Sequence, residues 1–78
     1  MNSSLIHFVS LNVRGLRDKL KRSKIFLWLK QQKSDIILLQ ETYWSTDLEM
    51  IIRNEWKGLC LFNHGTNHSK GVAMLIKK

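Results

Sequence analysis

Cysteine, proline and long apolar runs are scarce or absent in this chain of 78 residues. Cys60 is the single cysteine, which excludes an internal disulfide, whereas small secreted domains usually carry several. No apolar run approaches the roughly 20 residues of a transmembrane helix. The first residues lack the basic region and long apolar core of a secretion signal. We therefore expect an intracellular protein without a membrane partner.

Acidic residues are also few: six Asp and Glu stand against 13 Lys and Arg, which gives a formal net charge of +7. Such an excess favours a polyanionic partner such as DNA, although it also serves solubility. Six basic residues gather between positions 14 and 24: Arg14, Arg17, Lys19, Lys21, Arg22 and Lys24. This run predicts phosphate contacts by the first five, and we expect a nuclear protein. A nuclear address or a solvated helix entry fits the same run.

The apolar pattern predicts an α/β chain in the order β-α-β-α-β-β. The expected strands cover residues 5–13, 35–41, 59–63 and 71–78. A strand, a helix and a strand in succession predict a parallel crossover, and the last two strands are expected to be neighbours. Two helices are too few to cover both faces of an apolar sheet. We therefore expect residues 1–78 to form a single incomplete domain with exposed apolar patches and poor solubility.

Two helices are expected between these strands. The first follows the basic connection at 17–24, and the second opens on "TDLE" at 46–49, which fits a capping box. Gly58 is a plausible stop for the second helix. Apolar residues at i, i+3 and i+4 predict one buried face on each helix: Ile25, Trp28 and Leu29 on the first, Leu48, Ile51 and Ile52 on the second.

Asn12 and Glu41 lie at the carboxyl ends of the first two predicted strands. In open α/β sheets ligand sites form at such ends, and parallel neighbours would bring the two side chains to one edge. A carboxylate beside an amide suits a hard cation such as Mg²⁺, which prefers oxygen ligands and keeps several waters. A structural interpretation stays open: Asn12 caps the turn before Gly15, and Glu41 simply leaves the core for solvent.

Three strings also resemble a known family in order and approximate spacing. "SLNVRGL" at 10–16, "DIILLQET" at 35–42 and "GVAMLIKK" at 71–78 are similar to the start of the exonuclease–endonuclease–phosphatase superfamily. The likeness is greatest to the apurinic-type endonuclease domain of LINE-type (non-LTR) retrotransposons. It implies the N-terminal portion of a four-layered α/β sandwich that hydrolyses phosphodiesters with Mg²⁺. By this resemblance Glu41 binds the metal, and Asn12 belongs to the hydrogen-bond network of the active site.

The chain departs from the family pattern in ways that affect activity. Arg14 stands where repair-type members tend to carry an acidic residue, and Tyr43 follows "QET" where His or Lys is common. The catalytic tyrosine, the Asp-x-Asn segment and the late Asp and His of the family all come from later sequence. We therefore expect an N-terminal fragment of a Mg²⁺-dependent, retrotransposon-type DNA endonuclease, inactive alone and with Mg²⁺ weakly bound or absent. The alternatives are a small basic non-catalytic nucleic-acid-binding protein and a degraded coding remnant.

Overall fold

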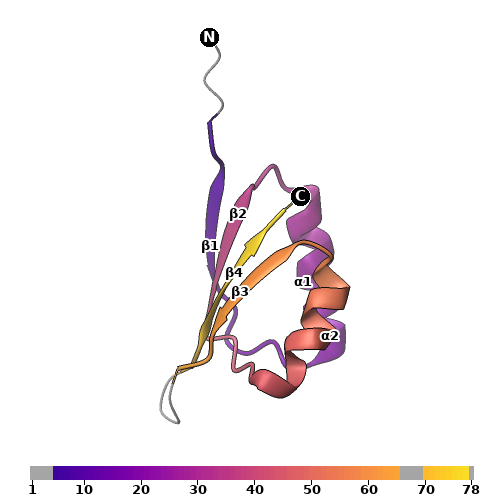
Figure 1. Cartoon of the computed structure of the whole chain (residues 1–78). Coiled ribbons are helices and arrows are strands. Elements are labelled where there is room, and N and C mark those ends of the chain that lie inside the picture. The colour runs from indigo at the N-terminus through magenta and orange to yellow at the C-terminus, as the bar shows by residue number, and fades with distance from the viewer. Residues whose placement is uncertain (1–4, 66–69, 78) are drawn as a thin grey trace.

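The computed structural model describes residues 5–65 and 70–77, and these fold into one sheet and two helices (Figure 1). The predicted order β-α-β-α-β-β and the α/β class are confirmed. The elements are β1 (Phe8–Asn12), α1 (Lys19–Gln31), β2 (Ile36–Gln40), α2 (Thr46–Trp56), β3 (Leu59–Asn63) and β4 (Val72–Ile76). The third strand has the predicted bounds, whereas the other three are shorter than predicted.

The strands lie in the order β1-β2-β4-β3. β1 and β2 are parallel, with Asn12 opposite Gln40, so the predicted parallel pair is confirmed. β3 and β4 are antiparallel neighbours, as predicted. β4 also pairs with β2, with Val72 opposite Gln40. The carboxyl ends of β1 and β2 therefore share one edge of the sheet with the start of β4, and this edge holds the residues of interest.

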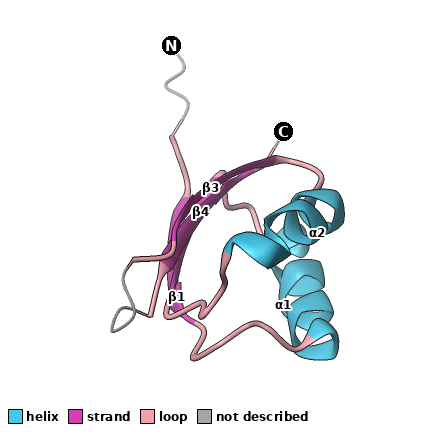
Figure 2. Cartoon of the chain, turned by 60° about the horizontal axis from the view of Figure 1, so that its bottom comes forward, coloured by secondary structure: helices cyan, strands magenta, loops and turns pink. Residues whose placement is uncertain are grey.

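Both helices pack on the same face of the sheet (Figures 1 and 2). Because side chains alternate along a strand, every second strand residue points toward the helices. Among these, Ile37 and Leu39 of β2 are fully buried. They pack in one core with Phe26 of α1 and Trp56 of α2, whose rings meet edge to face with centroids 5.5 Å apart. This core holds the two strand–helix connections, and with them the site edge, in place.

The opposite face, called the open face here, has no helix over it within residues 5–65 and 70–77 (Figure 2). The strand register arranges its residues in three rows: Phe8, Ile36, Ile76 and Leu59; Ser10, Leu38, Met74 and Leu61; Asn12, Gln40, Val72 and Asn63. None of these residues is charged, although the chain carries 19 charged side chains, 13 basic and six acidic. The expected exposure of apolar sheet is confirmed, and the polar row lies at the same edge as Glu41.

Helix α1 begins inside the basic run rather than after it. Asp18 is its N-cap, and the Asp18 carboxylate accepts a hydrogen bond from the Lys21 N–H at 2.8 Å. The buried residues of α1 are Arg22, Phe26 and Leu29. Trp28 is 47% exposed, so its predicted place in the buried face is wrong. Trp28 follows Phe26 by two residues, about 200° around the helix, and therefore faces away from the sheet.

Helix α2 also differs from the prediction at its start. Ser45, not Thr46, is the N-cap, and its side chain makes no capping hydrogen bond, so the capping box is wrong. Ser45 instead donates its hydroxyl hydrogen to Asp47. Ile52 is buried as predicted, but Ile51 is 46% exposed because it points away from the sheet. Within residues 5–65 and 70–77, neither helix is long and apolar enough to cross a membrane.

The end of α2 uses two residues in different ways. Lys57, rather than Gly58, takes the left-handed conformation that closes the helix, with φ of 61°. Gly58 is needed for space: a Cβ there would lie 2.6 Å from the Ile76 carbonyl oxygen and 2.7 Å from Trp56 Nε1. The Trp56 Nε1–H donates to that same carbonyl at 3.2 Å. Gly58 therefore lets the turn between α2 and β3 pass close to the Ile76 carbonyl at the end of β4.

Candidate functional site

Asn12 and Glu41 are in direct contact at the carboxyl edge of the β1–β2 pair. Asn12 is the last residue of β1, and Glu41 follows β2 directly. The Asn12 Nδ2–H donates to Glu41 Oε2 at 2.5 Å. The Oδ1 atom of Asn12 accepts the Arg14 N–H at 3.2 Å, so Asn12 caps the turn as well. The structure thus brings together the two residues that the sequence singled out, and Glu41, with 27% of its side chain exposed, is partly enclosed.

The backbone at Glu41 is held in an uncommon conformation. Its φ is 58°, in the left-handed region that residues other than glycine seldom adopt. Hydrogen bonds from the β1–α1 connection hold it: the Gly15 N–H donates to the Glu41 carbonyl at 2.6 Å, and the Leu16 N–H donates to the Thr42 carbonyl at 2.9 Å. On the other side, Tyr43 N–H donates to the Lys70 carbonyl at 2.8 Å. Two separate segments thus fix the direction of the Glu41 carboxylate.

Lys70 is a site residue that the sequence did not reveal. Its Nζ lies 3.6 Å from Glu41 Oε1. Lys70 precedes β4, and only the insertion of β4 between β2 and β3 brings it to Glu41. The Asn12 hydrogen bond is the main cause that lowers the pKa of Glu41. The nearby charges of Lys70 and Arg14 add to this effect, and partial burial opposes it. Glu41 is therefore an anion at neutral pH.

The donor set matches part of a site for a hard cation. Glu41 offers a carboxylate at the edge of the sheet. Asn12 holds one of its oxygens by a hydrogen bond, and the other oxygen faces the exposed side chain of Lys70. Mg²⁺ is commonly held by one or two carboxylates and keeps several waters, so one carboxylate suits it. Among the described residues, no cluster of three or more His, Cys, Asp or Glu side chains forms a complete metal site.

The predicted nucleic-acid contacts separate into two groups. Arg14 and Lys19 are exposed, and within the described residues their side chains make no hydrogen bond or ion pair. Arg17 and Lys21 bind the protein itself. Lys21 Nζ donates to the Val13 carbonyl at 2.9 Å and approaches the Arg14 carbonyl at 3.5 Å. Arg14, whose charge acts on Glu41, is thus an exposed basic side chain beside the site edge, and Lys19 is exposed at the start of α1.

Arg22 serves the interior rather than a ligand. Its side chain is 3% exposed. Its guanidinium forms two hydrogen bonds to the Glu55 carboxylate, at 2.6 and 3.0 Å. It also donates to the Leu16 carbonyl at 3.3 Å and to the Arg17 carbonyl at 2.8 Å. A buried guanidinium whose three nitrogens all donate to the protein is not available to a phosphate, so the predicted nucleic-acid contact by Arg22 is wrong.

These features define a class of protein: an α/β protein with an oxygen-donor site where a parallel strand pair ends. Comparison with known proteins is more specific. The model of the Endonuclease/Exonuclease/phosphatase family matches residues 9–78, and the chain belongs to this family. The match covers both Asn12 and Glu41. The family and superfamily resemblance inferred from the three sequence strings is thereby confirmed.

A curated relative adds the biological setting. The chain is 36% identical over 67 residues to a protein of Xenopus laevis described as the transposon TX1 uncharacterized 149 kDa protein. The match covers 86% of this chain but 5% of the relative, so the chain spans a small part of that protein's length. This supports the predicted retrotransposon context. No solved structure matches the chain.

Proposed function

We propose that this chain supplies the Asn12–Glu41 part of the metal centre of a Mg²⁺-dependent DNA endonuclease. The observation that carries the proposal is the hydrogen bond from Asn12 Nδ2 to Glu41 Oε2, made at the carboxyl edge of a parallel strand pair. Membership of a family of nucleases and phosphatases and likeness to a transposon protein support a DNA substrate.

Glu41 is the residue that would hold the ion. Its Oε1 atom lies 3.6 Å from Lys70 Nζ, and the Lys70 side chain is exposed. A divalent cation could therefore displace the Lys70 ammonium from the carboxylate. Asn12 would keep Oε2 oriented and the carboxylate ionised. A bound Mg²⁺ supplies positive charge that stabilises the charge building on a phosphoryl group during hydrolysis. Arg14 and Lys19 would guide the DNA backbone toward this edge through charge attraction.

We further propose that this chain cleaves DNA poorly or not at all by itself. Hydrolysis needs a group that activates the attacking water. Within the described residues, no histidine and no second carboxylate contacts Glu41, whose polar side-chain partners are Asn12 and Lys70. The remaining catalytic groups would come from further sequence in the longer endonuclease.

Nicking of supercoiled plasmid tests this proposal. We expect the wild-type chain with Mg²⁺ to nick no faster than the Glu41→Ala variant or a Mg²⁺-free control. Nicking well above background that Glu41→Ala abolishes would contradict the claim that the chain is inactive alone, while supporting Glu41 as the metal ligand. Nicking that Glu41→Ala leaves unchanged would count against Glu41 and point to a contaminating nuclease.

A second function, DNA binding without catalysis, is favoured by the charge of +7 and by the free side chains of Arg14 and Lys19. It predicts binding that weakens steeply as salt rises, because condensed counterions are released from the DNA. Such binding would survive Glu41→Ala and fall when Arg14 and Lys19 are both changed to Glu. Affinity that does not depend on salt would rule this function out.

A further inference from the structure

We propose that Arg17 is a positioning residue for Glu41. Its guanidinium fixes the segment 43–47 to the β1–α1 connection and thereby keeps Glu41 turned toward Asn12. Arg17 does not touch the Glu41 carboxylate and was predicted from the sequence to contact nucleic acid. The inference deepens the proposed metal site and rests on it for its functional meaning, while the geometric part is tested separately below.

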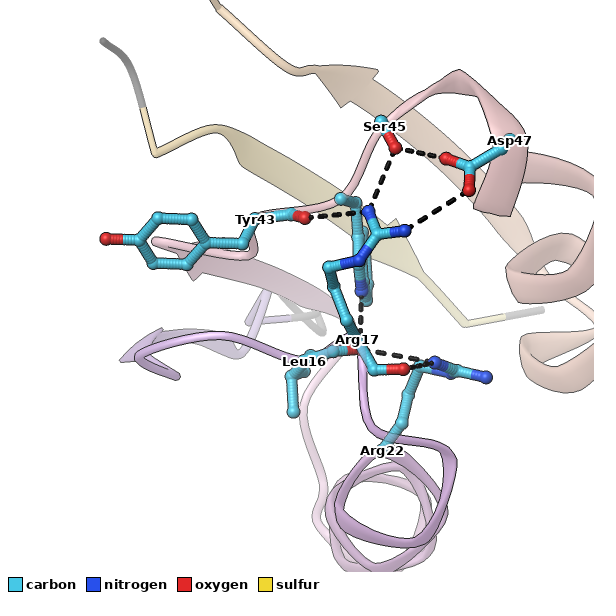
Figure 3. A network of polar contacts seen from close by, with 7 residues as sticks. Leu16, Arg17, Arg22, Tyr43, Ser45 and Asp47 are labelled. Atoms are coloured by element: carbon cyan, nitrogen blue, oxygen red, sulfur yellow. Dashed lines mark hydrogen bonds and ion pairs between the residues drawn. The ribbon is translucent and has the colours of Figure 1, made fainter. Parts of the chain in front are cut away.

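Arg17 spans two segments that are far apart in the sequence (Figure 3). Its Nη1 donates to the Tyr43 carbonyl at 3.2 Å and to Ser45 Oγ at 2.9 Å. Its Nη2 donates to Asp47 Oδ2 at 3.2 Å, and Asp47 in turn accepts the Ser45 hydroxyl hydrogen. A planar guanidinium with a fixed fork of donors can satisfy all three acceptors at once, which the single ammonium of lysine does less well.

The near end of this bridge is itself fixed. The buried Arg22 guanidinium holds the carbonyls of Leu16 and Arg17, at 3.3 and 2.8 Å (Figure 3). The Trp44 Nε1–H also donates to the Leu16 carbonyl, at 2.7 Å, and Trp44 is buried in the core. The backbone from which Arg17 reaches out is therefore rigid, so the contacts of its side chain constrain the 43–47 segment rather than merely following it.

The far end of the bridge lies two residues beyond Glu41. Tyr43, whose carbonyl Arg17 binds, has φ of 56°, and Glu41 has φ of 58°. Only the buried Thr42 separates these two left-handed residues. Backbone in such a conformation persists when its surroundings hold it. Releasing Tyr43 would let the chain at 41–43 relax toward ordinary dihedral angles, which would turn the Glu41 carboxylate away from Asn12.

Whether Mg²⁺ binding becomes weaker or stronger when Arg17 is changed distinguishes two explanations, the positioning of Glu41 and the charge of Arg17. Arg17 and Mg²⁺ are both cations, so removing the Arg17 charge would, by relief of Coulomb repulsion alone, strengthen Mg²⁺ binding or leave it unchanged. Positioning predicts the reverse: binding weakens. Arg17→Lys sharpens the distinction, since it keeps the charge but loses the fork that binds three acceptors.

The test is a Mg²⁺ titration followed by amide NMR shifts on the full chain. We expect Arg17→Gln and Arg17→Lys each to weaken binding about tenfold or more, the range seen when residues that orient metal ligands are changed. Asp47→Asn, which removes the charge of one of the three acceptors but keeps an oxygen that can accept, should weaken it less. Two variants serve as controls. Lys24→Gln removes one positive charge without breaking a hydrogen bond, and Ile52→Val lowers the stability of the fold without touching the Arg17 contacts. Both controls should bind as the wild type does.

A second readout does not depend on metal. The nuclear Overhauser effect between the Asn12 side-chain amide and the Glu41 side chain should be present in the wild type and lost in both Arg17 variants. Unchanged or tighter Mg²⁺ binding in Arg17→Gln, or wild-type binding in Arg17→Lys, would overturn the proposal. If the wild type binds no Mg²⁺, the proposed function fails, and the Overhauser effect alone decides whether Arg17 positions Glu41.

Discussion

At the scale of single residues, the basic side chains between positions 14 and 24 have different roles although they are neighbours in the sequence. Arg14 and Lys19 face solvent, whereas Arg22 is buried against Glu55. A buried guanidinium is tolerated only when charge and hydrogen bonds compensate the loss of water. Arg22 has both, from Glu55 and from the two carbonyls of the β1–α1 connection. It therefore links α1, α2 and the connection that leads to the site.

Removing the partner of Arg22 should destabilise the fold. In Glu55→Gln the buried guanidinium loses its counter-charge, and we expect the free energy of unfolding to fall by about 2–3 kcal/mol. Urea denaturation followed by tryptophan fluorescence measures this. Lys24→Gln, an exposed change of charge on the same helix as Arg22, should change stability by less than about 0.5 kcal/mol. Equal effects of the two variants would show that the Arg22–Glu55 pair does not stabilise the protein.

The same pair predicts how stability depends on pH. The hydrogen bonds from Arg22 are the main cause that lowers the pKa of Glu55 below its ordinary value of 4.5, with burial opposing. A carboxylate with a lowered pKa in the folded state stabilises the protein above the unfolded pKa, and this contribution is lost as pH falls through the folded pKa. Wild-type stability should therefore decline below about pH 4.5. The decline should be smaller in Glu55→Gln. The same dependence of the free energy of unfolding on pH in both proteins would contradict this prediction.

Residue-level reasoning predicted Asn12 and Glu41 but not their neighbours. Both predicted residues stand at strand ends, which a sequence reveals directly. Lys70 reaches Glu41 only through the strand order, and the burial of Arg22 depends on Glu55, 33 residues further along the chain. The sequence around a basic residue does not show whether the folded protein places a hydrogen-bond acceptor beside it. The hydrogen bonds that Arg17 and Arg22 make within the protein were therefore not predictable.

At the scale of elements, the turn from α2 into β3, which passes close to the end of β4, depends on two adjacent residues. Gly58 leaves room for the Ile76 carbonyl, and Lys57 takes a left-handed conformation without being glycine. The two positions should therefore respond to substitution in opposite directions, although they are neighbours in the same turn.

We expect Gly58→Ala to lower the free energy of unfolding by about 1–3 kcal/mol, because the new methyl group meets a backbone oxygen that cannot easily move. We expect Lys57→Gly to raise it by up to about 1 kcal/mol, since glycine adopts positive φ without strain. Thermal unfolding of both variants beside the wild type measures this. Destabilisation by Lys57→Gly or a neutral Gly58→Ala would contradict the account of this turn.

The sequence predicted the type and order of all six elements because each has a clear apolar period or a run of β-forming residues. It missed the phase of α1, since Ile25, Phe26, Leu27 and Trp28 are all apolar and the period alone does not choose a face. The contacts with the sheet bury Phe26 and leave Trp28 exposed. The insertion of β4 between β2 and β3 is likewise set by tertiary pairing, not by any local signal.

At the scale of the whole molecule, the sheet has one covered face and one open face. The open face has no charge in its three rows, and Leu61, in the middle row on the edge strand β3, is 52% exposed. A contiguous apolar surface of this kind favours association. The charged residues that the structure describes lie on the helices, their connections and the segments flanking the strands, so they do not protect this face.

We therefore expect the isolated chain to associate as its concentration rises, and Leu61→Lys to reduce that association by placing a charge in the open face. Sedimentation velocity across a concentration series measures it. Leu27→Lys, on an exposed part of α1, is the matched control and should leave association unchanged. A wild-type chain that stays monomeric over the series would contradict this prediction.

The central claim is that Glu41 is a ligand for a divalent cation at the edge formed by β1 and β2. The direct measurement is a Mg²⁺ titration monitored by amide NMR, comparing the wild type with Glu41→Gln. We predict saturable shifts in the wild type that centre on residues 12–15 and 41–43. The shifts should be absent in Glu41→Gln, which keeps the size of the side chain but loses its charge. Saturable shifts of equal size in both proteins, or none in the wild type, would contradict the claim.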